Sequence, residues 1–166
     1  MKAEVLVCFY NSYKLQGWRK PLIHLMCFSK HTHVHIELEF TNYRLIVLTV
    51  DGGSPRIIKL GLNKKFLGVD PYHITSFGEI DLHENINNYI NNYPLTKHWD
   101  LIKYQLKSYF WNVGDPPPTC ATFVSDFLGL HWILMPRFFS PKQLYDFLLN
   151  WRVTRNNSYD GNNVWR

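Results

Sequence analysis

The chain has 166 residues, 46% of them hydrophobic and 16% aromatic, and this length and composition fit one globular domain with a sizeable core. Its formal net charge of +5 is spread over scattered Lys and Arg residues, which does not favour nucleic acid as a partner. The three cysteines are an odd number, which argues against a disulfide framework. The sequence shows neither a signal peptide nor an apolar run long enough to span a membrane, so we expect a cytoplasmic protein.

The first half of the chain predicts mostly strands. AEVLVCFYNS, residues 3–12, is rich in β-branched and aromatic residues and predicts a first strand. The apolar spacing over residues 18–28 predicts a short amphipathic helix. Strands are predicted over residues 32–40 and 44–50, and the short polar turn between them indicates a hairpin. After DGGSPR, the segment RIIKL at 56–60 predicts one more strand.

The second half predicts helices. Apolar residues recur with a helical period over residues 82–90 and 96–109. The three consecutive prolines of GDPPPT then stop the chain, because they fit neither a helix interior nor a central strand. CATFVSDFLGL, residues 120–130, predicts a helix with one apolar face, and SPKQLYDFLLNW predicts a last helix that begins at Pro141 with Ser140 as its cap.

Strands first and helices later are typical of the α+β class, with an antiparallel sheet packed against helices. No internal repeat or linker divides the chain. We therefore expect a single domain over residues 1–154 and a mobile tail over residues 155–166.

Cys120 stands where a helix is predicted to begin. Thr119 is a good N-cap, so Cys120 is expected at the first helical position, where unpaired N–H groups and the helix dipole favour a thiolate. Cysteines in such positions can have a pKa of about 3.5–7.5 instead of about 8.5. A buried cysteine that opens a helix is nevertheless more often a small apolar residue than a nucleophile. Cys8 and Cys27, in apolar segments, are expected to be structural.

The segment HTHVHIELEF, residues 31–40, places His31, His33 and His35 at alternate positions of a predicted strand. Because a strand alternates faces, the three imidazoles are expected on one side of the sheet. One of them could take the proton of the Cys120 thiol and then protonate the leaving group. N–H groups at the start of the helix could supply an oxyanion hole.

A metal site is a rival interpretation of these histidines. Two imidazoles two residues apart on a strand lie on one side, and zinc accepts both His nitrogen and Cys sulfur. The sequence has no CxxC, no HExxH and no carboxylate at an obvious third-ligand spacing. We therefore assign no metal ligand and expect no cofactor.

The order of these parts resembles the circularly permuted members of the NlpC/P60 papain-like superfamily, in which the cysteine follows the histidine. HIELEF is similar to the His-Val-Glu-Leu-Val-Phe strand of a bacterial and phage branch of that group. TVDGGSPRIIKL resembles its Asp-Gly-Gly-Val-Arg segment, and TCATFVSDFLGL resembles its Cys-Ser-Glu-Leu-Val helix. The similarities span residues 27–130 and imply a papain-like fold.

The resemblance implies Cys120 as the nucleophile and His35 as the base, because HIEL fits the His-Val-Glu-Leu of the branch. His33 is the alternative base, since HVHI also resembles the His-Val-Gly-Ile form of the wider superfamily. Both choices share a strand face.

The third, orienting residue should lie on the strand paired with the histidine strand. With a three-residue turn centred on Asn42, Thr49 falls opposite His35, and a shift by one residue brings Val50 there instead. Asp51 is the next choice after Thr49 and needs a further bulge.

The sequence thus predicts a thiol hydrolase or acyltransferase that cleaves an amide, ester or thioester through an acyl-enzyme on Cys120. The expected partner is a peptide, acyl or lipid-like substrate, and the oligomeric state is left open. Ala121-Thr122 stands where the family has Ser-Glu, which keeps a catalytically idle scaffold, acting as a binding or virion-associated protein, as the alternative. A His/Cys zinc site is the second alternative. Frequent Asn is typical of a low-GC genome and suggests a phage source.

Overall fold

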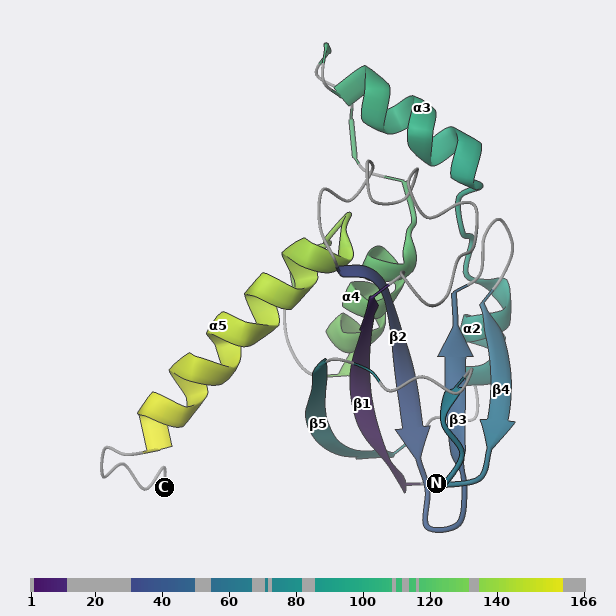
Figure 1. Cartoon of the computed structure of the whole chain (residues 1–166), viewed down its shortest axis with the longest axis vertical. Helices are drawn as coiled ribbons and strands as arrows, with labels where there is room; N and C mark the ends of the chain where they lie inside the picture. The colour runs from purple at the N-terminus through teal and green to yellow at the C-terminus, as the bar shows by residue number, and fades with distance from the viewer. Residues whose placement is uncertain are drawn as a thin grey trace.

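The computed structural model describes residues 2–11, 31–49, 55–66, 71, 73–81, 86–108, 110–111, 114–115, 117–131 and 135–159. These residues form the α+β arrangement expected from the sequence, with helices packed against a five-stranded antiparallel sheet (Figure 1). The strands are β1 (Lys2–Asn11), β2 (His31–Glu39), β3 (Arg44–Leu48), β4 (Arg56–Leu60) and β5 (His73–Asp81). The helices are α2 (Ile86–Asn92), α3 (His98–Ser108), α4 (Cys120–His131) and α5 (Pro141–Tyr159). The helix predicted over residues 18–28 lies outside the described residues.

The strand order across the sheet is β4-β3-β2-β1-β5. β2 and β3 form the predicted hairpin, and the Phe40 N–H donates to the Tyr43 carbonyl at 2.8 Å, which leaves Thr41 and Asn42 as the turn. The turn is therefore one residue shorter than the three-residue turn predicted from the sequence. This shortening moves the whole register between the two strands by one residue.

Strand β5 was not predicted from the sequence, and a bulge explains why. Glu4 of β1 pairs with Glu79, whereas Leu6 pairs with Ser76, so β5 carries one extra residue at this point. Gly78 lies in the extra stretch with a φ of 82°, a conformation that glycine adopts without strain. The extra residue interrupts the alternation of buried and exposed side chains by which a strand is recognised.

One face of the sheet, called here the helix face, is covered by α2, α4 and α5 (Figure 1). A fully buried aliphatic or aromatic side chain stabilises a fold by about 1.5–3 kcal/mol, so this layer contributes most of the apolar core. The buried side chains at this interface include Val5, Val7, Phe9, Val34, Ile36, Leu38, Ile90, Phe123, Val124, Phe127, Leu144 and Leu148.

The opposite face of the sheet, called here the loop face, carries a smaller buried cluster. Cys8, Tyr10 and Ile46 pack there with Phe66, which belongs to the segment 61–66 that follows β4. The Arg44 guanidinium donates a hydrogen bond to the Lys64 carbonyl and so fastens this segment to the sheet. Among the described residues, the segment 61–66 therefore contributes to the cover of this face.

The predicted start of the last helix is confirmed. The Gln143 N–H donates to Ser140 Oγ at 3.2 Å, and the Ser140 N–H donates to Gln143 Oε1 at 3.2 Å, which forms a capping box. Helix α5 continues to Tyr159, past residue 154, where the tail was expected to begin.

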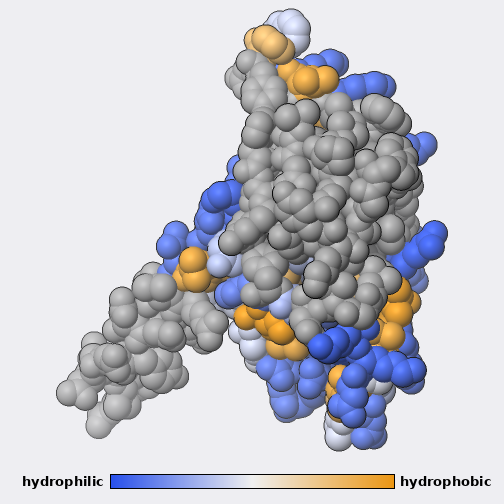
Figure 2. All heavy atoms as spheres, in the orientation of Figure 1, coloured by the Kyte–Doolittle hydropathy of each residue, from blue (hydrophilic) through white to orange (hydrophobic). Residues whose placement is uncertain are grey.

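Helix α3 lies at one end of the molecule, away from the sheet (Figure 1). Leu106, Phe110 and Trp111, at and just after its end, are exposed, and Figure 2 shows apolar side chains at this tip. None of the helices in the described part of the chain combines the length and the apolar character that crossing a membrane requires.

Candidate functional site

Helix α4 begins at the predicted residue and is capped as predicted. The Thr122 N–H donates to Thr119 Oγ1 at 3.2 Å, the Thr119 N–H donates to Thr122 Oγ1 in return, and the Phe123 N–H donates to the Thr119 carbonyl at 2.9 Å. Thr119 is therefore the N-cap, and Cys120 is the first helical residue. Cys120 is half-buried and packs against the apolar core of the helix face.

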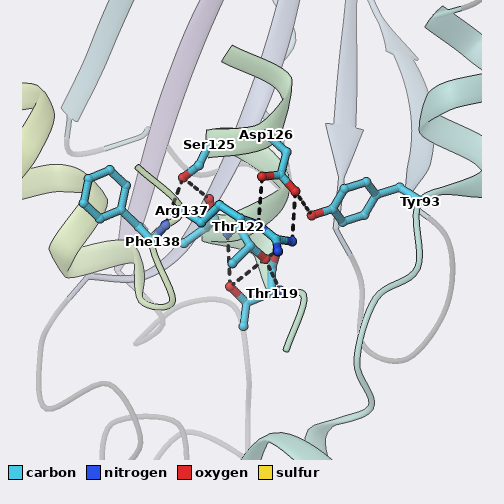
Figure 3. A network of polar contacts seen from close by, with 8 residues as sticks. Tyr93, Thr119, Thr122, Ser125, Asp126, Arg137 and Phe138 are labelled. Atoms are coloured by element: carbon cyan, nitrogen blue, oxygen red, sulfur yellow. Dashed lines mark hydrogen bonds and ion pairs between the residues drawn. The ribbon is translucent and has the colours of Figure 1, made fainter. Parts of the chain in front are cut away.

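The amino-terminal end of α4 is held in place from the segment that precedes α5. The Thr119 hydroxyl also donates to the Phe139 carbonyl at 2.9 Å. Farther along the helix, the Arg137 guanidinium binds the Asp126 carboxylate at 3.0 and 3.1 Å (Figure 3). The Tyr93 hydroxyl donates to the same carboxylate at 2.7 Å. These bonds fix the position of the helix that carries Cys120.

His33 and His35 lie on one face of β2, as the sequence predicted, with their ring centroids 5.7 Å apart. The alternate residues Val34 and Ile36 belong to the helix-face core. His35 instead stacks on Tyr10 at 4.8 Å on the loop face. Cys120 and His35 are thus on opposite faces of the sheet, and the structure does not bring this predicted pair together.

The strand alternation is interrupted at the start of β2. Tyr10 pairs with His33, but its neighbour Asn11 pairs with His31, so the register shifts by one residue. The predicted period of two is therefore established for His33 and His35, which lie beyond this irregularity.

The structure does not place the predicted third residue opposite the histidine. Ile36 pairs with Val47, so continuing this register by one residue brings Leu48, not Thr49, opposite His35. Thr49 is buried, and its Oγ1 has no hydrogen-bond partner among the described residues. Asp51 lies outside the described residues.

His73 is a histidine on the helix face that sequence reasoning missed, because β5 was not predicted. It pairs with Phe9, near the end of β1, and its ring lies 6.0 Å from the Phe9 ring and 5.0 Å from the Tyr145 ring of α5. Its Nε2 lies 3.0 Å from Thr75 Oγ1. The end of β1 adjoins the start of β2, and α4 begins at this same end of the sheet (Figure 1).

A second group of reactive side chains is buried on the loop face. Cys8 of β1 pairs directly with His35 of β2, and Glu37 lies two residues farther along β2 on the same face. One ligand atom from each of these three side chains lies within 4.8 Å of the others. His35 Nε2 and Glu37 Oε1 are 3.1 Å apart, and Arg44 Nη1 donates to Glu37 Oε2 at 2.8 Å.

Burial sets the protonation of this group. Burial, with Glu37 next, raises the pKa of the Cys8 thiol, and burial lowers the pKa of His35 against the opposing effect of Glu37. Burial alone would raise the pKa of the Glu37 carboxyl, but His35 and the Arg44 guanidinium outweigh it and lower that pKa. The group therefore contains a neutral thiol, a neutral imidazole and a carboxylate at neutral pH.

The two strands that carry this group were both predicted from the sequence. Their pairing and register were not, because residues 12–30 separate the strands and this separation is too long for a hairpin turn, which would fix the register. No protein-family model, curated protein or solved structure matches the chain. The functional proposals therefore depend on the chain's own residues.

Proposed function

We propose that the chain is a papain-like thiol hydrolase or acyltransferase with Cys120 as its nucleophile. One observation carries this proposal. Of the two cysteines that the structure describes, only Cys120 is both half-exposed and placed at the capped start of a helix, whereas Cys8 is buried within a polar cluster. A helix start favours a thiolate, which is the nucleophilic form of cysteine.

The arrangement around Cys120 supports a place in the permuted NlpC/P60 group. A cysteine that opens a helix, packed on an antiparallel sheet and preceded in the chain by the sheet's histidines, agrees with the resemblance in sequence. The helix is fixed at its start by Thr119, which bonds both to Thr122 and to Phe139. A nucleophile on a rigid element can be positioned closely against a substrate carbonyl.

We assign the role of base to His73 in place of the predicted His35. His35 is 0% exposed and lies on the other face of the sheet from Cys120. His73 is half-buried on the helix face, the same side of the sheet as Cys120, and Thr75 can hold the orientation of its ring. A base whose ring is oriented by a third group is the usual companion of a catalytic cysteine.

The proposed reaction follows the chemistry of cysteine acyl transfer. Cys120 Sγ attacks the carbonyl carbon of an amide, ester or thioester in a peptide, acyl or lipid-like substrate, and the thiol proton passes to the histidine. N–H groups of the first turn of α4 stabilise the oxyanion. The histidine then protonates the departing amine, alcohol or thiol. Water, or a second acceptor, finally takes the acyl group from Cys120.

The proposal is tested with p-nitrophenyl acetate as an acyl donor, by following nitrophenolate release and the intact mass of the protein. We expect a burst of one equivalent and an added acetyl group on Cys120, both absent in Cys120→Ser. The His73→Gln variant should acylate about 100- to 10,000-fold more slowly, whereas His33→Gln should acylate at the rate of the unchanged chain.

The control for reactivity is the same mass measurement at Cys8, which should gain no acetyl group. If Cys120 gains none either, the hydrolase proposal fails and the chain is a catalytically idle scaffold with a binding function. If His33→Gln, and not His73→Gln, slows acylation, the nucleophile stands and our choice of base is wrong.

A further inference from the structure

Cys8, His35 and Glu37 bring three kinds of metal-donor atom together in a buried place. The donors are a sulfur from β1, and a nitrogen and an oxygen from β2. Cys8 and His35 are each 0% exposed and Glu37 is 2% exposed. The group lies on the loop face, on the other side of the sheet from the apolar core against which Cys120 packs.

The spacing of the donors suits a tetrahedral ion. Two N or O ligands about 2.0–2.1 Å from a tetrahedral zinc lie about 3.3 Å from each other. His35 Nε2 and Glu37 Oε1 are already 3.1 Å apart, and all three ligand atoms lie within 4.8 Å of one another. Small side-chain rotations, without any change of strand register, would bring the Cys8 sulfur close enough to bind the same ion as the His35 and Glu37 ligand atoms.

One polar contact of the group supports the same ligand set. Arg44 holds the Glu37 carboxylate from outside at 2.8 Å, as outer-shell partners of metal ligands commonly do.

We propose that Cys8, His35 and Glu37 form a binding site for a divalent transition-metal ion. A thiolate, an imidazole and a carboxylate together match zinc better than magnesium or calcium, which prefer oxygen ligands alone. When the ion enters, the sulfur–metal bond forms and the Cys8 thiol proton leaves to solvent. The ion would join β1 to β2 beneath Phe66, which packs edge-on against the His35 ring at 5.2 Å.

The test uses the chain with Cys27→Ser and Cys120→Ser, so that Cys8 is its only thiol. The protein carries no histidine tag, and circular dichroism verifies its fold. Titration with cobalt(II) should give one equivalent of bound ion and a thiolate-to-cobalt charge-transfer band in the near ultraviolet. Zinc should displace the cobalt and remove the band. Replacing a ligand by His35→Gln should weaken binding by more than about 100-fold, the upper range for loss of an outer-shell partner.

A matched control is His33→Gln, a neighbouring histidine on the same face, which should keep the band. If the Cys8-only chain is folded and gives no charge-transfer band at saturating cobalt, the metal site does not exist. If the band survives His35→Gln unchanged, the ligand set is wrong. Should the Cys8-only chain fail to fold, zinc content of the unchanged chain after dialysis decides: one equivalent is expected, and none overturns the proposal.

Discussion

The two faces of the sheet bury different kinds of side chain and are covered by different segments of the chain. The helix face is apolar and is covered by α2, α4 and α5, with Cys120 at its margin. The loop face buries a thiol, an imidazole and an ion pair under the segment 61–66. The histidine strand β2 contributes to both faces, because its even-numbered residues lie in the apolar core and its odd-numbered residues lie in the polar cluster. A cysteine on one face is therefore not a partner for a histidine on the other.

The largest expected effect is on the apolar core. Phe123 is 0% exposed and its ring lies 4.9 Å from the Tyr93 ring, so Phe123→Ala should reduce the free energy of unfolding by about 3–5 kcal/mol. Phe66→Ala on the loop face should cost less, about 1–3 kcal/mol, because a loop can settle into the vacated space more easily than a helix. Urea unfolding of both variants measures the difference. A larger loss for Phe66→Ala would mean that the loop face, not the helix face, is the main source of stability.

The next largest effect concerns the buried ion pair. Glu37→Gln keeps the shape of the side chain but leaves the Arg44 guanidinium without its carboxylate, and it should destabilise the fold by about 2–4 kcal/mol. Because the pKa of Glu37 is lowered in the folded chain, its contribution is present above the ordinary carboxyl pKa and is lost as the pH falls through the folded pKa. Urea unfolding of Glu37→Gln and of the unchanged chain should be compared across this pH range. The difference between their free energies of unfolding should become smaller as the pH falls.

The control for that prediction is Glu39→Gln, two residues along the same strand and only half-buried. It should change the free energy of unfolding by less than about 0.5 kcal/mol. Equal losses in the two variants would show that the Glu37 cluster has no special role.

A smaller effect is expected at the helix caps. Thr119→Ala removes the side-chain acceptor for the Thr122 N–H and should cost about 1–2 kcal/mol in thermal or urea unfolding. Ser140→Ala removes the equivalent cap of α5, which receives the Gln143 N–H, and should cost about 1 kcal/mol. Only Thr119→Ala should also slow the alkylation of Cys120. Equal effects of the two caps on that rate would contradict the link between Thr119 and the thiol.

The smallest effect is a pH dependence on the helix face. Burial, together with the hydrogen bond to Asp126, raises the pKa of Tyr93 from 10.0 to about 12. The resulting stabilisation is fully present below pH 10 and is lost as the pH rises through about 12. Tyr93→Phe should therefore lose less stability than the unchanged chain over this interval. If the two proteins lose the same free energy of unfolding between pH 10 and about pH 12, ionisation of the Tyr93 hydroxyl is not linked to unfolding.

Local signals in the sequence were sufficient for the parts of the fold that depend on neighbouring residues. Thr119 and Ser140 were identified as caps from residue type and position, and both form the expected bonds. The β2–β3 hairpin was also predicted, because its turn is short and its strands are adjacent in the chain. Its register was wrong by one residue, since Thr41 and Asn42 alone make the turn.

Features that depend on distant pairing could not be predicted in the same way. A period of two correctly placed His33 and His35 on one face, but it does not say which face meets the helices. That choice is made by Val34 and Ile36, whose burial against α4 fixes the strand. The partnership of Cys8 with His35 requires the β1–β2 register, which no short turn specifies.

The most direct test of the account is the rate at which iodoacetamide alkylates each cysteine of the native chain between about pH 5 and pH 9, with the site read by mass spectrometry. We predict that Cys120 reacts quickly below pH 7, that His73→Gln slows it, and that Cys8 stays unmodified until the chain unfolds. Fast alkylation of Cys8, or a Cys120 that reacts only as an ordinary thiol near pH 8.5, would contradict the division of roles between the two faces.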